Sequence, residues 1–359
     1  MGEGDYAADD CNAGADTTQE IDTFIGEVSK SDKSFSYTGT VSQILGLVNW
    51  SVKVMVRDGE TDPDAIAKIK DEYLGLNWSP SDDFLVYRLN VNIVPKITKV
   101  RPADAPDLTI ENIALLHNAK LTLNVVASVV YSWFDPPGLI CPLILKYKLL
   151  LSETIHAGVK WKEELPDAYQ TKWKVALEEA IQFGEMKFPR TVKPEGGVTG
   201  RSSLVFYADG SKSAFGAPIY TRWKLKNPDP NKTVADLDGN EHIVTYSCRL
   251  LAAKAKIAKM ENVARNEMEG LLLGARLVTA VLPGLSEKPV SILPILDSRC
   301  TIQSVDAKDK ILKEFFNNRC EEWGEHERKW ESQGITVEQI HHTPGIYNIA
   351  DLATEEKLN

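Results

Sequence analysis

A short stretch near the middle of the chain decides the expected fold: Ser-Ser-Leu-Val-Phe-Tyr-Ala-Asp-Gly-Ser, residues 202–211. Its apolar run, Leu204 to Ala208, is typical of a buried strand, which the Gly-Ser pair ends. Asp209 then lies at the end of that strand, where desolvation of a carboxylate is costly and a metal ion is the usual partner. An Asp before Gly is also a common turn residue. Other acids of the chain must decide between the two interpretations.

The residues after this strand predict a mixed sheet with helices on its faces. Further strands are expected at 214–224, 242–250, 290–296 and 336–341. Helices are expected at 263–281, around 308–324, and from about Asn348 onward. The order, three strands followed by alternating helices and strands, is typical of a mixed α/β domain.

Three more acids occupy positions comparable to that of Asp209. Asp297 ends the strand at 290–296, Glu267 lies in the first turns of the helix at 263–281, and Asp351 begins the last helix. Glu267 lies on the helix face that should pack on the sheet. Taken singly, acids are common at helix starts, caps and turns. Together they would repel one another unless divalent cations neutralise them, and an all-oxygen ligand set suits Mg²⁺ or Mn²⁺.

The same acids belong to motifs that extend over most of the chain. These are Gly14-Ala15-Asp16-Thr17 after an Asp-Asp pair, Leu74-Gly75-Leu76-Asn77-Trp78, Phe134-Asp135-Pro136-Pro137-Gly138-Leu139, Tyr207-Ala208-Asp209-Gly210-Ser211, Arg265-Asn266-Glu267, Leu296-Asp297-Ser298, Asn318-Arg319, and His342-Thr343-Pro344-Gly345 with Asn348, Ala350 and Asp351. In this order they resemble the C-terminal half of the polymerase polyprotein of Bel/Pao-type LTR retrotransposons, and residues 202–351 resemble its ribonuclease H domain.

The resemblance implies a fold and a domain order. A ribonuclease H-like five-stranded mixed sheet with flanking helices is expected at 202–359, after a linker at 189–201. A helical thumb/connection-like region is expected at 101–188, and a remnant of the reverse transcriptase palm with a β-rich region at 1–100. The class is thus α/β (mixed), preceded by an α+β region.

The resemblance also implies an activity. It predicts an endonuclease that hydrolyses the RNA strand of RNA–DNA hybrids with two Mg²⁺ ions, or Mn²⁺ in their place, as part of a retrotransposon reverse transcriptase. Asp209 would bridge both ions, Glu267 and Asp297 would hold the ion at the leaving group, and Asp351 the ion at the attacking water.

His342 would assist proton transfer and product release, with His341 as the competing candidate. Glu269 offers a second acid beside Glu267, although the spacing to Gly274 favours Glu267.

An alternative function is a catalytically inactive, retroelement-derived fragment that binds nucleic acid or acts as a scaffold, because the segment around Glu267 departs from the family pattern.

Asp9 and Asp10, after Tyr6, form a distorted version of the polymerase Tyr-x-Asp-Asp hairpin; an acidic chain terminus is the simpler interpretation. We interpret the pair as a vestigial motif. No polymerase activity is expected from this chain alone, because the earlier metal-binding Asp and the fingers are absent from it. Primer extension on a primed template would contradict that expectation.

The net charge of −10 does not exclude a nucleic-acid partner, because residues 1–30 account for −7 of it with eight acids and one lysine. Phosphate contacts are expected from residues near the acids, although a solvated surface is the alternative for each: Ser211, Arg249, Lys254, Asn318 and Arg319. The remainder of a reverse transcriptase is a further expected partner.

Location is expected to be intracellular: the cytoplasm, a virus-like particle or the nucleus. The five cysteines are scattered without a Cys-x-x-Cys pair, which is typical of free thiols in a reducing compartment. The sequence contains no long apolar run, and neither a membrane partner nor a small-molecule cofactor is expected.

Overall fold

The computed structural model describes residues 76–79, 82–94, 107–133, 135–194, 197–235, 239–307 and 313–354. These residues fall into two compact units. The helical unit contains the described residues of 67–135 and 142–189, and the sheet unit contains the described residues of 136–141 and 190–354. The Asp-Asp pair at Asp9 and Asp10 lies outside the described residues.

In its described residues, the helical unit combines a small antiparallel sheet with four α-helices and a 3-10 helix. The sheet has the order β1 (Leu76–Ser79), β2 (Phe84–Arg88), β3 (Glu185–Pro189). The helices are the 3-10 helix η3 (Ile110–Asn112), α5 (Ala114–Asn118), α6 (Leu123–Val130), α7 (Cys141–His156) and α8 (Asp167–Gln182). Trp173 is buried and donates to Thr154 Oγ1 at 3.0 Å, which holds α8 to α7. The sequence also predicts helices over 143–157 and around 167–184, and α7 and α8 confirm both.

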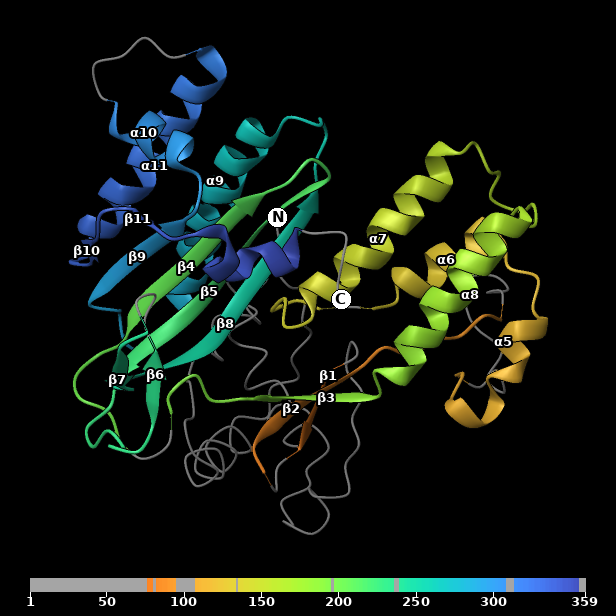
Figure 1. The fold of residues 1–359 in the computed structure, drawn as a ribbon, viewed down its shortest axis with the longest axis horizontal. Helices are drawn as coiled ribbons and strands as arrows, with labels where there is room; N and C mark the ends of the chain where they lie inside the picture. The colour runs from red at the N-terminus through yellow and green to blue at the C-terminus, as the bar shows by residue number, and fades with distance from the viewer. Residues whose placement is uncertain are drawn as a thin grey trace, which may run out of the picture. The chain divides into compact units, whose positions relative to one another are not determined.

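The sheet unit is built around a mixed sheet (Figure 1). Its strands are β4 (Ser203–Gly210), β5 (Ala214–Lys224), β8 (Tyr246–Ile257), β9 (Ser291–Leu296), β10 (Thr336–Val337) and β11 (His341–His342). The order is β10-β9-β4-β5-β8, and β11 also lies parallel to β9. β4 is antiparallel to β5 and parallel to β9. The predicted mixed sheet is confirmed. In place of its expected fifth strand there are two short strands, β10 and β11.

The predicted third strand is wrong in its bounds. β8 runs from Tyr246 to Ile257 instead of 242–250, because it pairs with all of β5, from Ala214 opposite Ile257 to Lys224 opposite Tyr246. Residues Glu241–Ile243 instead form β7, which pairs with β6 (Thr233–Ala235) in a separate hairpin. The bounds of β8 depend on the length of its antiparallel partner, β5. Because that partner lies elsewhere in the sequence, the residues around β8 alone do not predict its bounds.

Helix α9 (Val263–Val281) covers β4 and β5, and its predicted bounds are confirmed (Figure 1). Its sheet-facing residues Leu271 and Val278 are fully buried. α11 (Glu314–Glu331) packs against α9 with Trp323 and Trp330 in the core. The remaining helices are η4 (Leu282–Gly284), α10 (Arg299–Asp306), η5 (Gly345–Tyr347) and η6 (Ile349–Ala353).

The Pro136–Cys141 segment, which carries the Pro-Pro-Gly-Leu motif, packs on β8. The backbone N–H of Ala253 donates to the Pro137 carbonyl at 2.8 Å. Gly138 has φ +76°, and a Cβ there would lie 1.8 Å from the Ala253 carbonyl oxygen. Only glycine fits this close approach. The segment therefore belongs to the sheet unit, although the chain on both sides of it belongs to the helical unit.

Among the described helices, none combines the length and the apolar character needed to cross a membrane.

Candidate metal and active site

Three of the predicted acids converge at one edge of the mixed sheet. Asp209 lies near the end of β4, Asp297 follows β9, and Glu267 lies in the second turn of α9. β4 and β9 are parallel neighbours with Ala208 opposite Leu296, so the next residue on each strand brings Asp209 beside Asp297. One carboxylate oxygen from each of the three residues lies within 4.8 Å of the others.

Two glycines let α9 come close enough to bring Glu267 to Asp209. A Cβ at Gly210 would lie 2.2 Å from the backbone nitrogen of Glu267. A Cβ at Gly270 would lie 2.5 Å from the carbonyl oxygen of Asp209. Side chains are excluded at both positions, so helix and strand backbones are in direct contact where the acids meet.

The electrostatics of this cluster are unfavourable without a cation. Asp209 is only 8% exposed. The Oε2 atom of Glu267 is buried and has no hydrogen-bond partner among the described residues. Burial, and to a smaller extent the negative charges of Asp209, Asp297 and Asp351, raise the pKa of Glu267 to about 9. A buried carboxylate oxygen without a donor is costly, so the cluster is suited to a positively charged ligand.

The donor set fits a hard divalent cation. All three residues offer carboxylate oxygens, and no nitrogen or sulfur ligand belongs to the set. Mg²⁺ and Mn²⁺ prefer such oxygen ligands. The unsatisfied oxygen of Glu267 is the observation on which this fit rests.

Asp351, the fourth predicted acid, lies in the first turn of η6. Its charge acts on Glu267. The set of oxygens within 4.8 Å of one another consists of Asp209, Glu267 and Asp297. The structure thus brings three of the acids into one cluster and the fourth close enough to interact electrostatically.

Two residues on the C-terminal segment support the acids. The Asn348 side-chain amide donates to Asp297 Oδ1 at 3.1 Å and to the Ala208 carbonyl at 3.0 Å. The Thr354 hydroxyl donates to Asp209 Oδ2. The sequence motifs include Asn348 without predicting this role, and they do not include Thr354. Its signal in the sequence is its spacing of three from Asp351, which places both on one side of a 3-10 turn.

The two candidate histidines lie next to each other on β11. His341 is exposed. His342 is half-buried, and its Nε2 accepts a hydrogen bond at 3.3 Å from Nε of Arg299, two residues beyond Asp297. His342 therefore contacts a neighbour of the cluster, and the choice between the two histidines stays a prediction.

The five residues predicted to bind nucleic acid lie on β8, on α11 and in the turn after β4. The hydroxyl of Ser211, after β4, donates to the Thr354 carbonyl at 3.0 Å, and its oxygen also lies 3.2 Å from the Ala214 carbonyl. Arg249 and Lys254 are on β8, with Lys254 exposed. Asn318 is exposed on α11, next to Arg319. Their contacts with nucleic acid stay predictions.

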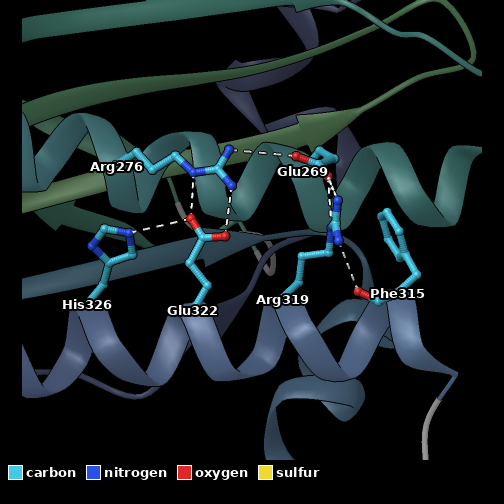
Figure 2. Close-up of polar contacts among 6 residues, drawn as sticks. All are labelled: Glu269, Arg276, Phe315, Arg319, Glu322 and His326. Carbon is cyan, nitrogen blue, oxygen red and sulfur yellow. Dashed lines mark hydrogen bonds and ion pairs between the residues drawn. The ribbon is translucent and has the colours of Figure 1, made fainter.

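Glu269, the alternative to Glu267, faces α11 and not the cluster (Figure 2). Its carboxylate accepts from Arg319 at 2.7 Å and lies 3.7 Å from Arg276. Arg276 in turn makes a bidentate pair with Glu322 at 2.6 and 2.8 Å. Arg319 also stacks on the Phe315 ring, 3.8 Å from its centroid. Glu269 is thus occupied by arginines, whereas Glu267 lies at the cluster.

Part of this chain is similar to a known family. Residues 122–298, just under half of the chain, match the model described as "Pao retrotransposon-like RNaseH-like domain". The matched range contains Asp209, Glu267 and Asp297. A search of curated proteins found no match.

Several solved structures are similar to parts of the chain. The N-terminal RNase H domain of a Mycobacterium tuberculosis protein is 13% identical with a TM-score of 0.30, covering 43% of this chain and 91% of that one. LC11-RNase H1 in complex with an RNA/DNA hybrid is 14% identical with a TM-score of 0.24, covering 41% and 91%. A foamy viral protease-reverse transcriptase in complex with double-stranded DNA is 13% identical with a TM-score of 0.34, covering 90% and 50%.

The mixed sheet agrees with the fold that the motifs predicted, and the family match falls on the same segment. The match at residues 122–298 to that family model confirms the retroelement resemblance read from the sequence.

Proposed function

We propose that this protein is a metal-dependent endonuclease that hydrolyses the RNA strand of RNA–DNA hybrids, as the ribonuclease H part of a retrotransposon reverse transcriptase. The observation that carries the proposal is the convergence of Asp209, Glu267 and Asp297 from β4, α9 and the end of β9, with Glu267 Oε2 buried and unsatisfied. Repelling carboxylates are not kept together for stability, since each costs free energy in this arrangement.

In this proposal the residues have distinct roles. Asp209, Glu267, Asp297 and Asp351 hold two Mg²⁺ or Mn²⁺ ions. When bound, such ions stabilise charge on the phosphate and lower the pKa of the attacking water. Asn348 keeps the Asp297 carboxylate oriented by donating to its Oδ1. His342, next to Arg299, moves a proton at its ring nitrogen and assists product release.

Substrate binding is proposed to come from phosphate contacts, with Lys254 and Asn318 as exposed candidates. Such contacts make affinity fall with salt concentration. Selection of the RNA strand would require contacts with its 2′-hydroxyl groups. The activity is proposed to be intracellular, in the cytoplasm, a virus-like particle or the nucleus.

The test is cleavage of a labelled RNA–DNA hybrid by the full chain in Mg²⁺ or Mn²⁺. Wild type should cleave the RNA strand, and Glu267→Gln should lower kcat by roughly 100-fold or more, since it removes a charged ligand from the cluster. Glu269→Gln is the matched control. It removes the same charge two residues away on the face toward α11 and should retain kcat.

Loss of activity in both glutamine variants would show that the charge and not the position matters, and would contradict the assignment. If wild type is inactive on hybrid, single-stranded and duplex RNA in both metals, the alternative function as an inactive nucleic-acid-binding or scaffold fragment stands.

A further inference from the structure

We propose that Thr354 is a positioning residue for Asp209: its hydroxyl orients the Asp209 carboxylate for cation binding and fastens the turn that carries Asp351 to β4. The inference deepens the proposed function and rests on it. Thr354 does not need to touch a cation or the substrate, because it acts through the two acids.

The first support is the hydrogen bond to Asp209. Thr354 is fully buried, and its Oγ1 donates to Asp209 Oδ2. The three acids of the cluster can only accept hydrogen bonds when ionised, so a donor must come from elsewhere. A threonine hydroxyl supplies that donor without adding charge.

The second support is the link to Asp351. The Thr354 Oγ1 also lies 3.3 Å from the Asp351 carbonyl, and the Thr354 N–H donates to the same carbonyl at 3.0 Å. A hydroxyl has a single proton, and the Asp209 contact is the shorter of its two acceptor contacts. The hydroxyl thus lies between the side chain of one acid and the backbone of another, which are far apart in sequence.

The third support is a hydrogen bond that holds the backbone of Thr354 in place. Ser211, two residues after Asp209, donates from its hydroxyl to the Thr354 carbonyl at 3.0 Å. Its Oγ also accepts from the backbone N–H groups of Ser213 and Ala214 at 3.2 and 3.0 Å. The tight turn after β4 therefore holds Thr354 from one side while Asp209 holds it from the other.

These contacts fix the carboxylate orientation before a cation arrives. Partners that orient metal ligands contribute to affinity because the ligands lose less freedom on binding. Without the hydroxyl, Asp209 would lose a donor and η6 would lose a direct connection to β4. We expect a variant without this hydroxyl to keep the same fold and to bind cations more weakly.

The experiment compares Thr354→Ala with Thr354→Ser in the full chain, because these two variants differ only by the hydroxyl. The measurements are the Mg²⁺ concentration at half-maximal hybrid cleavage and, independently, the rise in Tm with Mn²⁺ concentration. Thr354→Ala should need about 10-fold more Mg²⁺ and Mn²⁺ than Thr354→Ser. Thr354→Ser should stay within about twofold of wild type, as expected when the donor is kept.

Thr221 provides the matched control. Its hydroxyl is equally buried and donates to the Val192 carbonyl at 2.9 Å, away from the acids. In the absence of cations, Thr221→Ala and Thr221→Ser should have different Tm values. The cation concentration at half-saturation should be the same for both variants. If Thr354→Ala does not fold, Ser211→Ala takes its place, with an expected increase of about 3-fold for loss of an indirect partner.

The outcomes separate this inference from the proposed function. Equal cation midpoints for the alanine and serine variants at position 354, in an active wild type, overturn the role of Thr354 and leave the function intact. A wild type that neither cleaves hybrid nor gains Tm with Mn²⁺ overturns both.

Discussion

Glu267 shows at the scale of one residue how the proposed function costs stability. Its raised pKa, about 9, means that the folded state resists the ionisation that the unfolded chain undergoes near 4.5. Between these values the folded state binds more protons, so stability falls as pH rises through that window.

Glu267→Gln should therefore stabilise the metal-free protein. The amide resembles the protonated acid in shape and cannot ionise, so the gain should be small near pH 5 and on the order of 1–3 kcal/mol at pH 8. Urea unfolding in EDTA at the two pH values measures it. A gain in stability that is the same at both pH values, or a loss at pH 8, would contradict the interpretation that ionised Glu267 destabilises the metal-free protein.

The convergence of Asp209, Glu267 and Asp297 could be predicted from sequence because each lies at a recognisable place: after an apolar strand, or in the first turns of a helix. The choice between Glu267 and Glu269 needed α11, since only the structure shows Arg319 and Arg276 beside Glu269. Thr354 is harder to identify, because its spacing of three from Asp351 places it only on the same side of a turn, and its hydrogen bond to Asp209 crosses 145 residues.

At the scale of elements, the contact of α9 with β4 determines the geometry of the site. Gly270→Ala should separate the two, because the added Cβ would lie 2.5 Å from a backbone carbonyl that cannot move away alone. We expect a loss of about 1–3 kcal/mol, as is typical of overpacking, together with weaker cation binding. Urea unfolding and the Mn²⁺-dependent rise in Tm report the two effects.

Gly324→Ala on α11 is the control for this substitution. There the nearest atom is the Arg328 guanidinium Nη1 at 3.2 Å, the end of a flexible side chain. The helix-propensity gain of about 0.5–1 kcal/mol should outweigh that contact, with no change in cation binding. If both alanine variants behave alike, the close approach of α9 to β4 does not limit the site.

The packing of residues 136–141 on β8 gives a second prediction at this scale. Gly138→Ala and Gly158→Ala share similar φ values, +76° and +77°, so both carry the same backbone strain of about 1 kcal/mol. Only Gly138 has a neighbour, the Ala253 carbonyl. Gly138→Ala should therefore lose at least about 1 kcal/mol more than Gly158→Ala in urea unfolding. Equal losses would show that the segment does not bind β8 tightly.

Local patterns predicted some elements well and others poorly, for physical reasons. The bounds of α9 could be read directly, because Asn262 caps it through the Arg265 N–H and its apolar face repeats at helical spacing. β8 was misplaced because its bounds come from pairing with β5. The final helix, η6, begins where expected but is a 3-10 turn, and Thr354 closes it through the Asp351 carbonyl.

At the scale of the whole molecule, the cluster should make stability depend on divalent cations. A ligand that binds only the folded state adds about 2.7 kcal/mol at 100 times its Kd. The Tm of wild type should rise by several degrees when Mg²⁺ or Mn²⁺ is added, and it should return to its metal-free value when EDTA removes the cation. Calorimetry of the full chain can follow both changes. Asp209→Asn should show little of this rise. An equal rise in that variant would place the stabilising cation elsewhere.

The bond between Asp209 and Thr354 also has a consequence for how the protein is made. The acids occupy residues 209 to 351, and the hydroxyl that supports them comes from residue 354. During translation, strand β4 leaves the ribosome long before its partners on η6 exist, and its pairing with them is a late, long-range event. A nascent chain therefore carries an incomplete cluster until residue 354 has left the ribosome.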